Sequence, residues 1–306
     1  MTDRQVAPGL PYEARVKMAL PSGSLRDHLG AFRLGESTLK GRGVQLVYEA
    51  QRLTDSWRSY LSGPDETRTE DVIDGLCRDT YDMVWFGRGG SGCGRVVDDI
   101  VRYAKTLRTP QLVMGFSDLT SLLIPLAQRC GWITFHGPVV TSIGRSEPQT
   151  NLDEILGILR GENESIEITR QDYDTSEGVL LGGNLTVLAS MLGTPMAPLP
   201  AKDSIWFIED VGESPYRLDR AFTQLCNSGL FEDATAIWVG DLGLADSGEA
   251  EALLEGFAAD ASCPVILGAP AGHSGRLVPL PIGGQVGIDW RRGQMHALSP
   301  WVGGRR

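Results

Sequence analysis

The sequence predicts an α/β fold whose first half is built on a parallel β-sheet and whose second half is richer in strands and turns. Five short apolar runs have the length and composition of buried strands; they lie at 15–20, 44–48, 83–87, 111–115 and 133–136. Helical patterns separate these runs, as at 95–105, where apolar residues recur on one face. Strands that alternate with helices in this way are typical of a parallel sheet covered on both faces.

A change in polarity divides the chain of 306 residues, which is long enough for two domains. Residues 146–176 are polar around one short helix expected at 152–159. Strands are expected beyond this segment at 205–209, 236–240, 265–268 and 285–289, and helices near 184–192, 216–228 and 248–258. We therefore expect an N-terminal α/β domain at 1–145, a linker at 146–176 and a C-terminal domain at 177–306.

Composition excludes several classes of partner. The chain has 39 acidic and 28 basic side chains, and a net charge of −11 argues against a nucleic-acid or anionic-membrane partner. Its five cysteines are scattered with no Cys-x-x-Cys pair, as expected for a reducing compartment without a disulfide framework or a thiolate zinc site. The first residues contain no apolar signal core, and no run reaches membrane-spanning length. We expect a cytoplasmic protein without a metal ion or cofactor.

The turn around Ser117 is the first candidate for chemistry. A buried strand is expected to end at Gly115, and a helix-competent segment follows Asp118. A serine in such a turn holds its hydroxyl clear of the sheet and beside backbone N–H groups at a helix N-terminus, as a nucleophile requires. A serine or aspartate before a helix is also a common N-cap, so both roles remain open at this point.

A serine nucleophile needs a base and a group that orients the base. The chain has four histidines, and His273 is the best candidate because small residues surround it in the loop 269–275. Glu209 follows four apolar residues at the end of a predicted strand, and a buried carboxylate there needs a partner. The nearby Asp210 and Glu213 are equally compatible with a solvated loop or with the start of the next helix.

The glycine-rich run 87–95 is expected to follow a strand and open a helix. It matches neither the P-loop pattern nor the dinucleotide fingerprint, but its backbone N–H groups could form an oxyanion hole. Cys93 lies between two glycines and is a rival nucleophile. No glycine occupies position 91 or 95, so the cysteine elbow of amidotransferases is absent, and a buried apolar role is expected for Cys93.

Several motifs together resemble the LD-carboxypeptidases, serine peptidases with a Ser-His-Glu triad. The matches run in the family's order from about residue 16 to residue 288. They are Arg88-Gly-Gly, Gly115-Phe-Ser-Asp-Leu-Thr120, His136-Gly-Pro138, Gly182-Gly-Asn-Leu185, Glu209-Asp-Val-Gly-Glu213, Tyr216-Arg-Leu-Asp-Arg220, Gly272-His273 and Leu280-Pro-Ile-Gly283. Each motif is weak alone, but their common order is specific.

The resemblance implies that Ser117 is the nucleophile, His273 the base and Glu209 its orienting group. It further implies an oxyanion hole from the backbone N–H groups of Gly90 and Asp118. The implied fold is an N-terminal flavodoxin-like or class I amidotransferase-like domain with a C-terminal β-rich α/β domain, and the implied assembly is a homodimer.

The implied substrate is a small peptide, the murein tetrapeptide, cut between the L-centre of its diamino acid and the terminal D-alanine. The candidate substrate contacts are Arg88, Ser91, Asn184 and Arg276. Either arginine could hold a substrate carboxylate or form a surface ion pair.

Three positions depart from the family pattern and bear on substrate preference. Ser91 and Phe116 stand where an aromatic residue and a tyrosine are usual, and Pro125 interrupts the helix after Ser117. Three rival functions remain: a microcin-immunity peptidase that cleaves aminoacyl or peptidyl nucleotides, a non-catalytic binding module, and a cysteine hydrolase using Cys93. The continuation Val211-Gly-Glu213 favours the murein branch.

Overall fold

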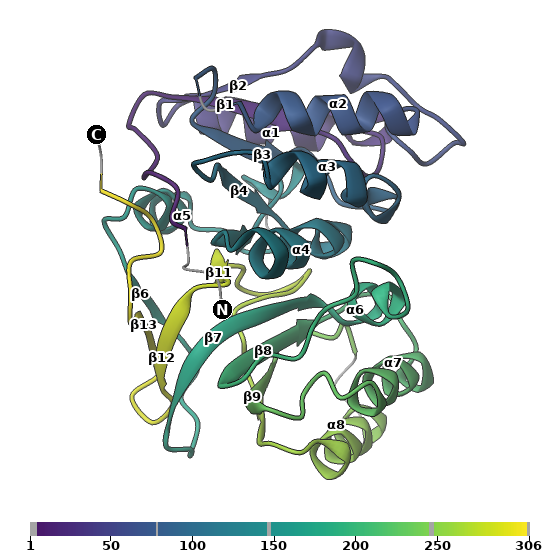
Figure 1. Cartoon of the computed structure of the whole chain (residues 1–306), viewed down its shortest axis with the longest axis vertical. Helices are drawn as coiled ribbons and strands as arrows, with labels where there is room; N and C mark the ends of the chain where they lie inside the picture. Colours follow the sequence, from purple (N-terminus) through teal and green to yellow (C-terminus); the bar gives the residue numbers. More distant parts are fainter. Residues whose placement is uncertain (1–4, 78, 146–147, 245–247, 305–306) are drawn as a thin grey trace.

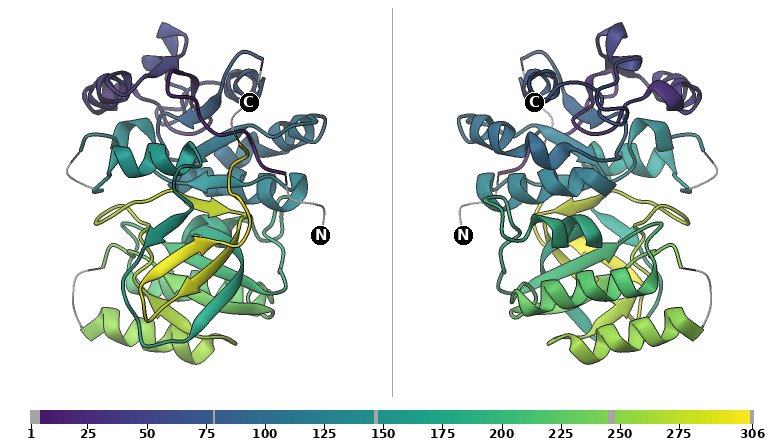
Figure 2. Two further views of the ribbon diagram at one scale, coloured as in Figure 1. Left: turned by 90° about the vertical axis from the view of Figure 1, so that its left-hand side faces the viewer. Right: turned by 90° about the vertical axis from the view of Figure 1, so that its right-hand side faces the viewer.

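The structure is a computed structural model and describes residues 5–77, 79–145, 148–244 and 248–304. The N-terminal half lies above the C-terminal half along the long axis of the molecule (Figure 1). Figure 2 shows the same division from both sides. Each half contains one β-sheet, so the predicted α/β class with two sheet-based halves is confirmed.

The first sheet contains the five strands that the apolar runs predict. They are β1 (Ala14–Ala19), β2 (Val44–Val47), β3 (Met83–Phe86), β4 (Leu112–Gly115) and β5 (Thr134–His136). All five are parallel, in the order β2-β1-β3-β4-β5, which is a common order of doubly wound sheets. In such sheets ligands bind beyond the carboxyl ends of the strands.

Four helices cover the two faces of this sheet: α1 (Leu29–Lys40), α2 (Asp65–Gly75), α3 (Val97–Ala104) and α4 (Thr120–Cys130). Alternate side chains of β3 belong to different hydrophobic clusters: Trp85 to the one that includes residues of α1, and Phe86 to the one that includes residues of α2 and α3. Because both faces are buried, β3 and β4 are continuous apolar runs. Short 3-10 turns complete this half at η1 (Arg26–His28), η2 (Ala50–Leu53), η3 (Cys93–Arg95), η4 (Ser117–Leu119) and η5 (Val140–Ser142).

The second sheet is mixed. Its parallel part contains β7 (Thr175–Asn184), β8 (Ser204–Glu209), β9 (Ala234–Val239) and β10 (Val265–Leu267). Its antiparallel part adds β12 (Gln285–Asp289), β13 (Gln294–Ala297) and β6 (Ser165–Glu167) beside β7. The helices of this half are α6 (Leu185–Met191), α7 (Pro215–Asn227) and α8 (Gly248–Asp260).

Two segments connect the halves more closely than the sequence indicates. Residues 146–176, expected as a linker, include α5 (Leu152–Leu159) and the strand β6, although 146–147 lie outside the described residues. The strand β11 (Leu280–Ile282) comes from the C-terminal half but pairs antiparallel with β5 at the edge of the first sheet (Figure 1). Among the described residues, no helix is both long enough and apolar enough to cross a membrane.

Candidate active site

Ser117 occupies a strained turn between β4 and the helix that follows. Phe116 is extended (φ −147°, ψ −176°), and Ser117 then takes φ 64° before η4 leads into α4. A non-glycine residue in this left-handed region stores strain of ~1–3 kcal/mol, and such residues cluster at functional sites. The strained strand-to-helix turn is the geometry that presents a serine nucleophile above a sheet.

The glycine-rich loop lies directly against Ser117. A Cβ atom added at Gly89 would lie 3.1 Å from Ser117 Cβ and 3.3 Å from Ser117 Oγ, so a side chain at position 89 would crowd the serine. The loop is held in place because Gly89 accepts the N–H of Gly23 at 3.0 Å. The Cys93 N–H donates to Asp118 Oδ2 at 2.9 Å and ties the end of the loop to the serine turn.

Gly90, the predicted oxyanion donor, is exposed with φ 109°, one residue beyond the contact with Ser117. Asp118, the second predicted donor, lies in η4 at the start of the helical segment, where backbone N–H groups favour negative charge. Sequence reasoning missed Gly89, the glycine whose missing side chain lets the loop reach the serine.

His273 and Glu209 form a hydrogen-bonded pair. His273 Nδ1 lies 2.9 Å from Glu209 Oε2, and the Glu209 side chain is fully buried. Burial alone lowers the pKa of His273, but the hydrogen bond and charge of Glu209, together with the charges of Asp210 and Asp241, outweigh it and leave the pKa raised. Burial raises the pKa of Glu209, and the His273 hydrogen bond opposes that effect. With Nδ1 facing the carboxylate, Nε2 is the ring atom left for proton transfer.

Aromatic packing places the imidazole beside the serine turn. The ring of Phe116, which directly precedes Ser117, lies 4.7 Å from the His273 ring, centre to centre. The fully buried His136 makes edge contacts with Phe116 at 6.0 Å and with Phe207 at 4.8 Å. Burial and the neighbouring His273 lower the pKa of His136 to about 3, so it stays neutral. Sequence reasoning missed this aromatic cluster because its members lie far apart in the chain.

Cys93 is fully buried in η3. Burial strongly raises the pKa of its thiol, and the neighbouring Asp118 adds to the effect. Because the thiolate is the nucleophilic form, this environment supports the buried apolar role expected for Cys93. All five cysteines are free.

The four candidate substrate contacts lie in different environments. Arg88 Nη1 donates to the Ser24 carbonyl at 3.0 Å, and Ser91 is exposed in the glycine-rich loop. Asn184 is buried and caps α6, since its side-chain oxygen accepts the Val187 N–H at 3.0 Å.

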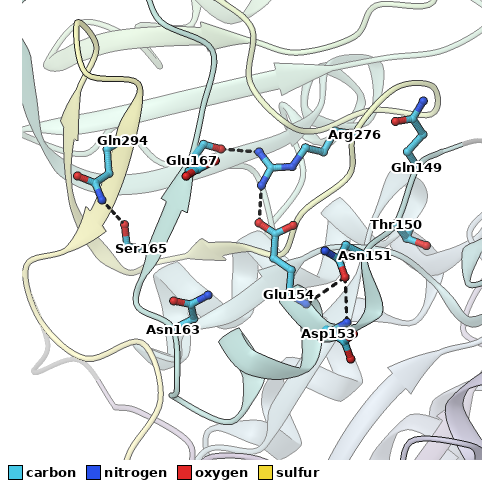
Figure 3. A pocket seen from close by; sticks show the side chains of 10 residues that line it. All are labelled: Gln149, Thr150, Asn151, Asp153, Glu154, Asn163, Ser165, Glu167, Arg276 and Gln294. Carbon is cyan, nitrogen blue, oxygen red and sulfur yellow. Dashed lines mark hydrogen bonds and ion pairs between the residues drawn. The ribbon is translucent and has the colours of Figure 1, made fainter.

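Arg276 lies in a polar cavity of about 1000 Å³ (Figure 3). Its guanidinium points between Glu154, with which it forms an ion pair, and the carbonyl of Glu167. The charge of Arg276 is therefore already compensated within the protein. Within the described ranges, no three His, Cys, Asp or Glu side chains gather in a way that could hold a metal ion.

Comparisons with known proteins identify the family to which the chain belongs. The LD-carboxypeptidase N-terminal domain matches residues 16–137, and the LD-carboxypeptidase C-terminal domain matches residues 177–288. A murein tetrapeptide carboxypeptidase of Pseudomonas aeruginosa is 30% identical over 298 residues, covering 92% of this chain and 95% of that protein.

Two solved structures share the fold. A muramoyltetrapeptide carboxypeptidase from Oxalobacter formigenes has a TM-score of 0.78 at 26% identity, over 95% of this chain and 100% of that one. The protein MccF, solved in complex with glutamyl sulfamoyl guanosine, has a TM-score of 0.84 at 20% identity, over 97% of this chain and 99% of that one. The two domain matches and the full-length relative lead to one conclusion: the chain belongs to the LD-carboxypeptidase family.

Proposed function

We propose that this chain is a serine carboxypeptidase that hydrolyses the L,D-amide bond of murein tetrapeptides and releases the terminal D-alanine. The observation that carries the proposal is the strained Ser117 turn beside a histidine that is hydrogen-bonded to a buried glutamate. Relatives named for murein tetrapeptide cleavage support the choice of substrate. We further propose a role in peptidoglycan recycling; the cytoplasmic location and the homodimer remain predictions.

The reaction proceeds through an acyl-enzyme. Ser117 Oγ attacks the carbonyl carbon of the diamino acid's L-centre, and His273 Nε2 takes the hydroxyl proton. The C–N bond then breaks, and His273 returns the proton to the leaving amine of D-alanine. Water attacks the acyl-enzyme by the same route and frees Ser117. Glu209 holds the imidazole tautomer and stabilises the imidazolium in both halves of the cycle.

The backbone N–H groups of Gly90 and Asp118 are proposed to stabilise the oxyanion that forms during each attack. One such donor contributes ~3–4 kcal/mol to transition-state stabilisation. This role is consistent with the close approach of the glycine-rich loop to Ser117, where a side chain at position 89 would crowd the serine.

Arg88 is the better candidate for the substrate's carboxylate. It lies in the loop that contacts Ser117, and it forms no ion pair with the described residues. Arg276 is instead already paired with Glu154. A guanidinium outside an ion pair can bind a carboxylate in a two-pronged arrangement.

The decisive experiment is incubation of the purified protein with a muropeptide tetrapeptide, with release of D-alanine followed by mass spectrometry. We expect release by the natural chain and by Cys93→Ala, and loss of release in Ser117→Ala. Absence of release by the natural chain would overturn the substrate assignment.

A parallel incubation with an aminoacyl sulfamoyl adenylate separates the rival functions. Cleavage of this compound with an intact tetrapeptide would support a microcin-immunity peptidase. Cleavage of neither would support a binding module, and loss of turnover in Cys93→Ala alone would support a cysteine hydrolase.

A further inference from the structure

A hydrogen bond joins the two halves of the molecule next to the reacting serine. Thr120 is the first residue of α4, three positions after Ser117, and its side chain is fully buried. Its Oγ1 accepts the backbone N–H of Asn184 at 3.0 Å. Asn184 is the last residue of β7 and belongs to the C-terminal half. Figure 1 shows α4 of the upper half above β7 of the lower half.

The strand end at Asn184 is directly connected to the buried glutamate. In the parallel pairing of β7 and β8, Asn184 is the register partner of Glu209. The Asn184 side chain also lowers the pKa of that carboxyl against the larger, opposite effect of burial. A hydrogen bond, a strand pairing and a second hydrogen bond therefore lead from Thr120 through Asn184 and Glu209 to His273.

The two halves also touch sterically at this point. Gly183 has φ 152°, and a Cβ atom there would lie 2.4 Å from Thr120 Oγ1 and 2.5 Å from Thr120 Cγ2. The side chain of Thr120 thus packs directly onto backbone at the end of β7. The Thr120 side chain makes both the close contact with Gly183 and the hydrogen bond to Asn184.

We propose that Thr120 is a positioning residue that sets where the His273–Glu209 pair lies relative to Ser117. Ser117 and Thr120 lie on one continuous turn and helix, and Glu209 lies on the strand beside Asn184, so the Thr120 hydroxyl links the two parts of the site. The consequence for catalysis rests on the proposed serine carboxypeptidase function. The consequence for the His273–Glu209 pair does not depend on the substrate.

The test compares Thr120→Val with Thr120→Ser. Valine keeps the shape but removes the acceptor, whereas serine keeps the hydroxyl. Small misplacements of reacting groups cost up to ~10²-fold in rate, so we expect Thr120→Val to lower kcat ~10–100-fold with KM changed less than about twofold. Thr120→Ser should recover kcat to within about threefold of the natural chain.

Thr134→Val is the matched control. Thr134 is equally buried, but its hydroxyl donates to Leu123 within the N-terminal half, at 3.3 Å. We expect this variant to keep the natural kcat even where its melting temperature falls. A Thr120→Val enzyme with natural kcat, or a loss that Thr134→Val reproduces, would overturn the proposal.

A second readout is independent of the substrate. The His273 pKa, followed by NMR of the imidazole Cε1–H, should fall towards its ordinary value in Thr120→Val because Glu209 no longer lies in place. It should stay raised in Thr120→Ser and Thr134→Val, and an unchanged pKa in Thr120→Val would contradict the proposal. If the natural chain releases no D-alanine, the proposed function fails while this titration still tests Thr120. If Thr120→Val does not fold, Thr120→Ala replaces it in both measurements. Alanine also removes the acceptor, and it leaves room for water at the Asn184 N–H.

Discussion

At the scale of single residues, the proposed mechanism makes the activity dependent on pH through the His273–Glu209 pair. His273 must be neutral to accept the Ser117 proton, and Glu209 raises the pKa of His273 against the effect of burial. Activity should therefore rise with pH through this raised pKa. The stability that the protonated pair contributes has the opposite dependence: it is present below the ordinary histidine pKa of ~6.5 and is lost as pH rises through the folded value.

Glu209→Gln tests this dependence. Glutamine keeps the size but removes the charge, so we expect the acid limb of the kcat/KM profile to move to lower pH and kcat to fall ~10³–10⁴-fold. Asp210→Asn is the control, because Asp210 raises the His273 pKa by charge alone and less than Glu209 does. Asp210→Asn should move the acid limb only slightly to lower pH and leave kcat within about tenfold of the value for the natural chain. An acid limb that stays in place in Glu209→Gln would contradict the pairing.

The strain at Ser117 gives a prediction about stability. Glycine adopts φ 64° without penalty, whereas alanine keeps the strain of the side chain. We expect both Ser117→Gly and Ser117→Ala to be inactive, and Ser117→Gly to be the more stable by ~1 kcal/mol. The measurement is the free energy of unfolding from urea titration. Equal stability of the two variants would mean that the turn is not strained.

At the scale of elements, the sequence predicted the regular parts of the fold and missed strands that depend on distant partners. All five strands of the parallel sheet and the helix at 152–159 are confirmed, because buried apolar runs carry their own signal. The strand β7 escaped prediction since glycines interrupt it, and β11 since it has only three residues including Pro281. Proline is tolerated there because β11 is an edge strand.

The candidate site divides in the same way. Ser117, Glu209 and His273 follow recognisable local patterns at strand ends or in a small-residue loop, so sequence reasoning could single them out. The contacts of Phe116 with His273 and of Thr120 with Asn184 join residues from different halves. No local pattern encodes such contacts, because they depend on how the two sheets are placed relative to each other.

Arg68 holds the glycine-rich loop from within the protein. It is fully buried in α2, and its guanidinium donates to the carbonyls of Gly92 at 2.8 Å, Gly63 at 3.1 Å and Pro21. Lysine cannot reproduce this fork of donors, so Arg68→Lys should leave buried carbonyls unpaired. We expect a loss of ~1–3 kcal/mol in unfolding free energy and a lower kcat because the loop shifts from Ser117.

The matched control is Arg95→Lys. Arg95 pairs with the same carboxylate as Arg68, that of Asp65, but lies at the surface. Its replacement should leave the unfolding free energy close to that of the natural chain, as is usual for exposed ion pairs. Equal effects of the two substitutions on urea unfolding and on kcat would show that the buried contacts of Arg68 do not hold the loop.

At the scale of the whole molecule, the two halves are interlocked rather than merely adjacent. The chain leaves the C-terminal half to place β11 beside β5 and then returns to form β12. The contact of α4 with β7 adds a second connection, and the site itself takes Ser117 from one half and the His273–Glu209 pair from the other. The geometry of the proposed catalytic site is therefore a property of the complete chain.

This interlocking predicts that the halves unfold together. Leu225 is fully buried in α7, far from the first sheet in the fold, and Leu225→Ala should remove ~2–5 kcal/mol of stability. If unfolding is cooperative, hydrogen exchange followed by mass spectrometry should show the same loss of protection in peptides of β3 as in peptides of β8. If protection in β3 stays at its natural level while β8 loses its own, the halves unfold independently. The pairing of β11 with β5 would then contribute too little to couple the unfolding of the two halves. The placement of Ser117 relative to Glu209 would depend only on local contacts, such as the hydrogen bond between Thr120 and Asn184.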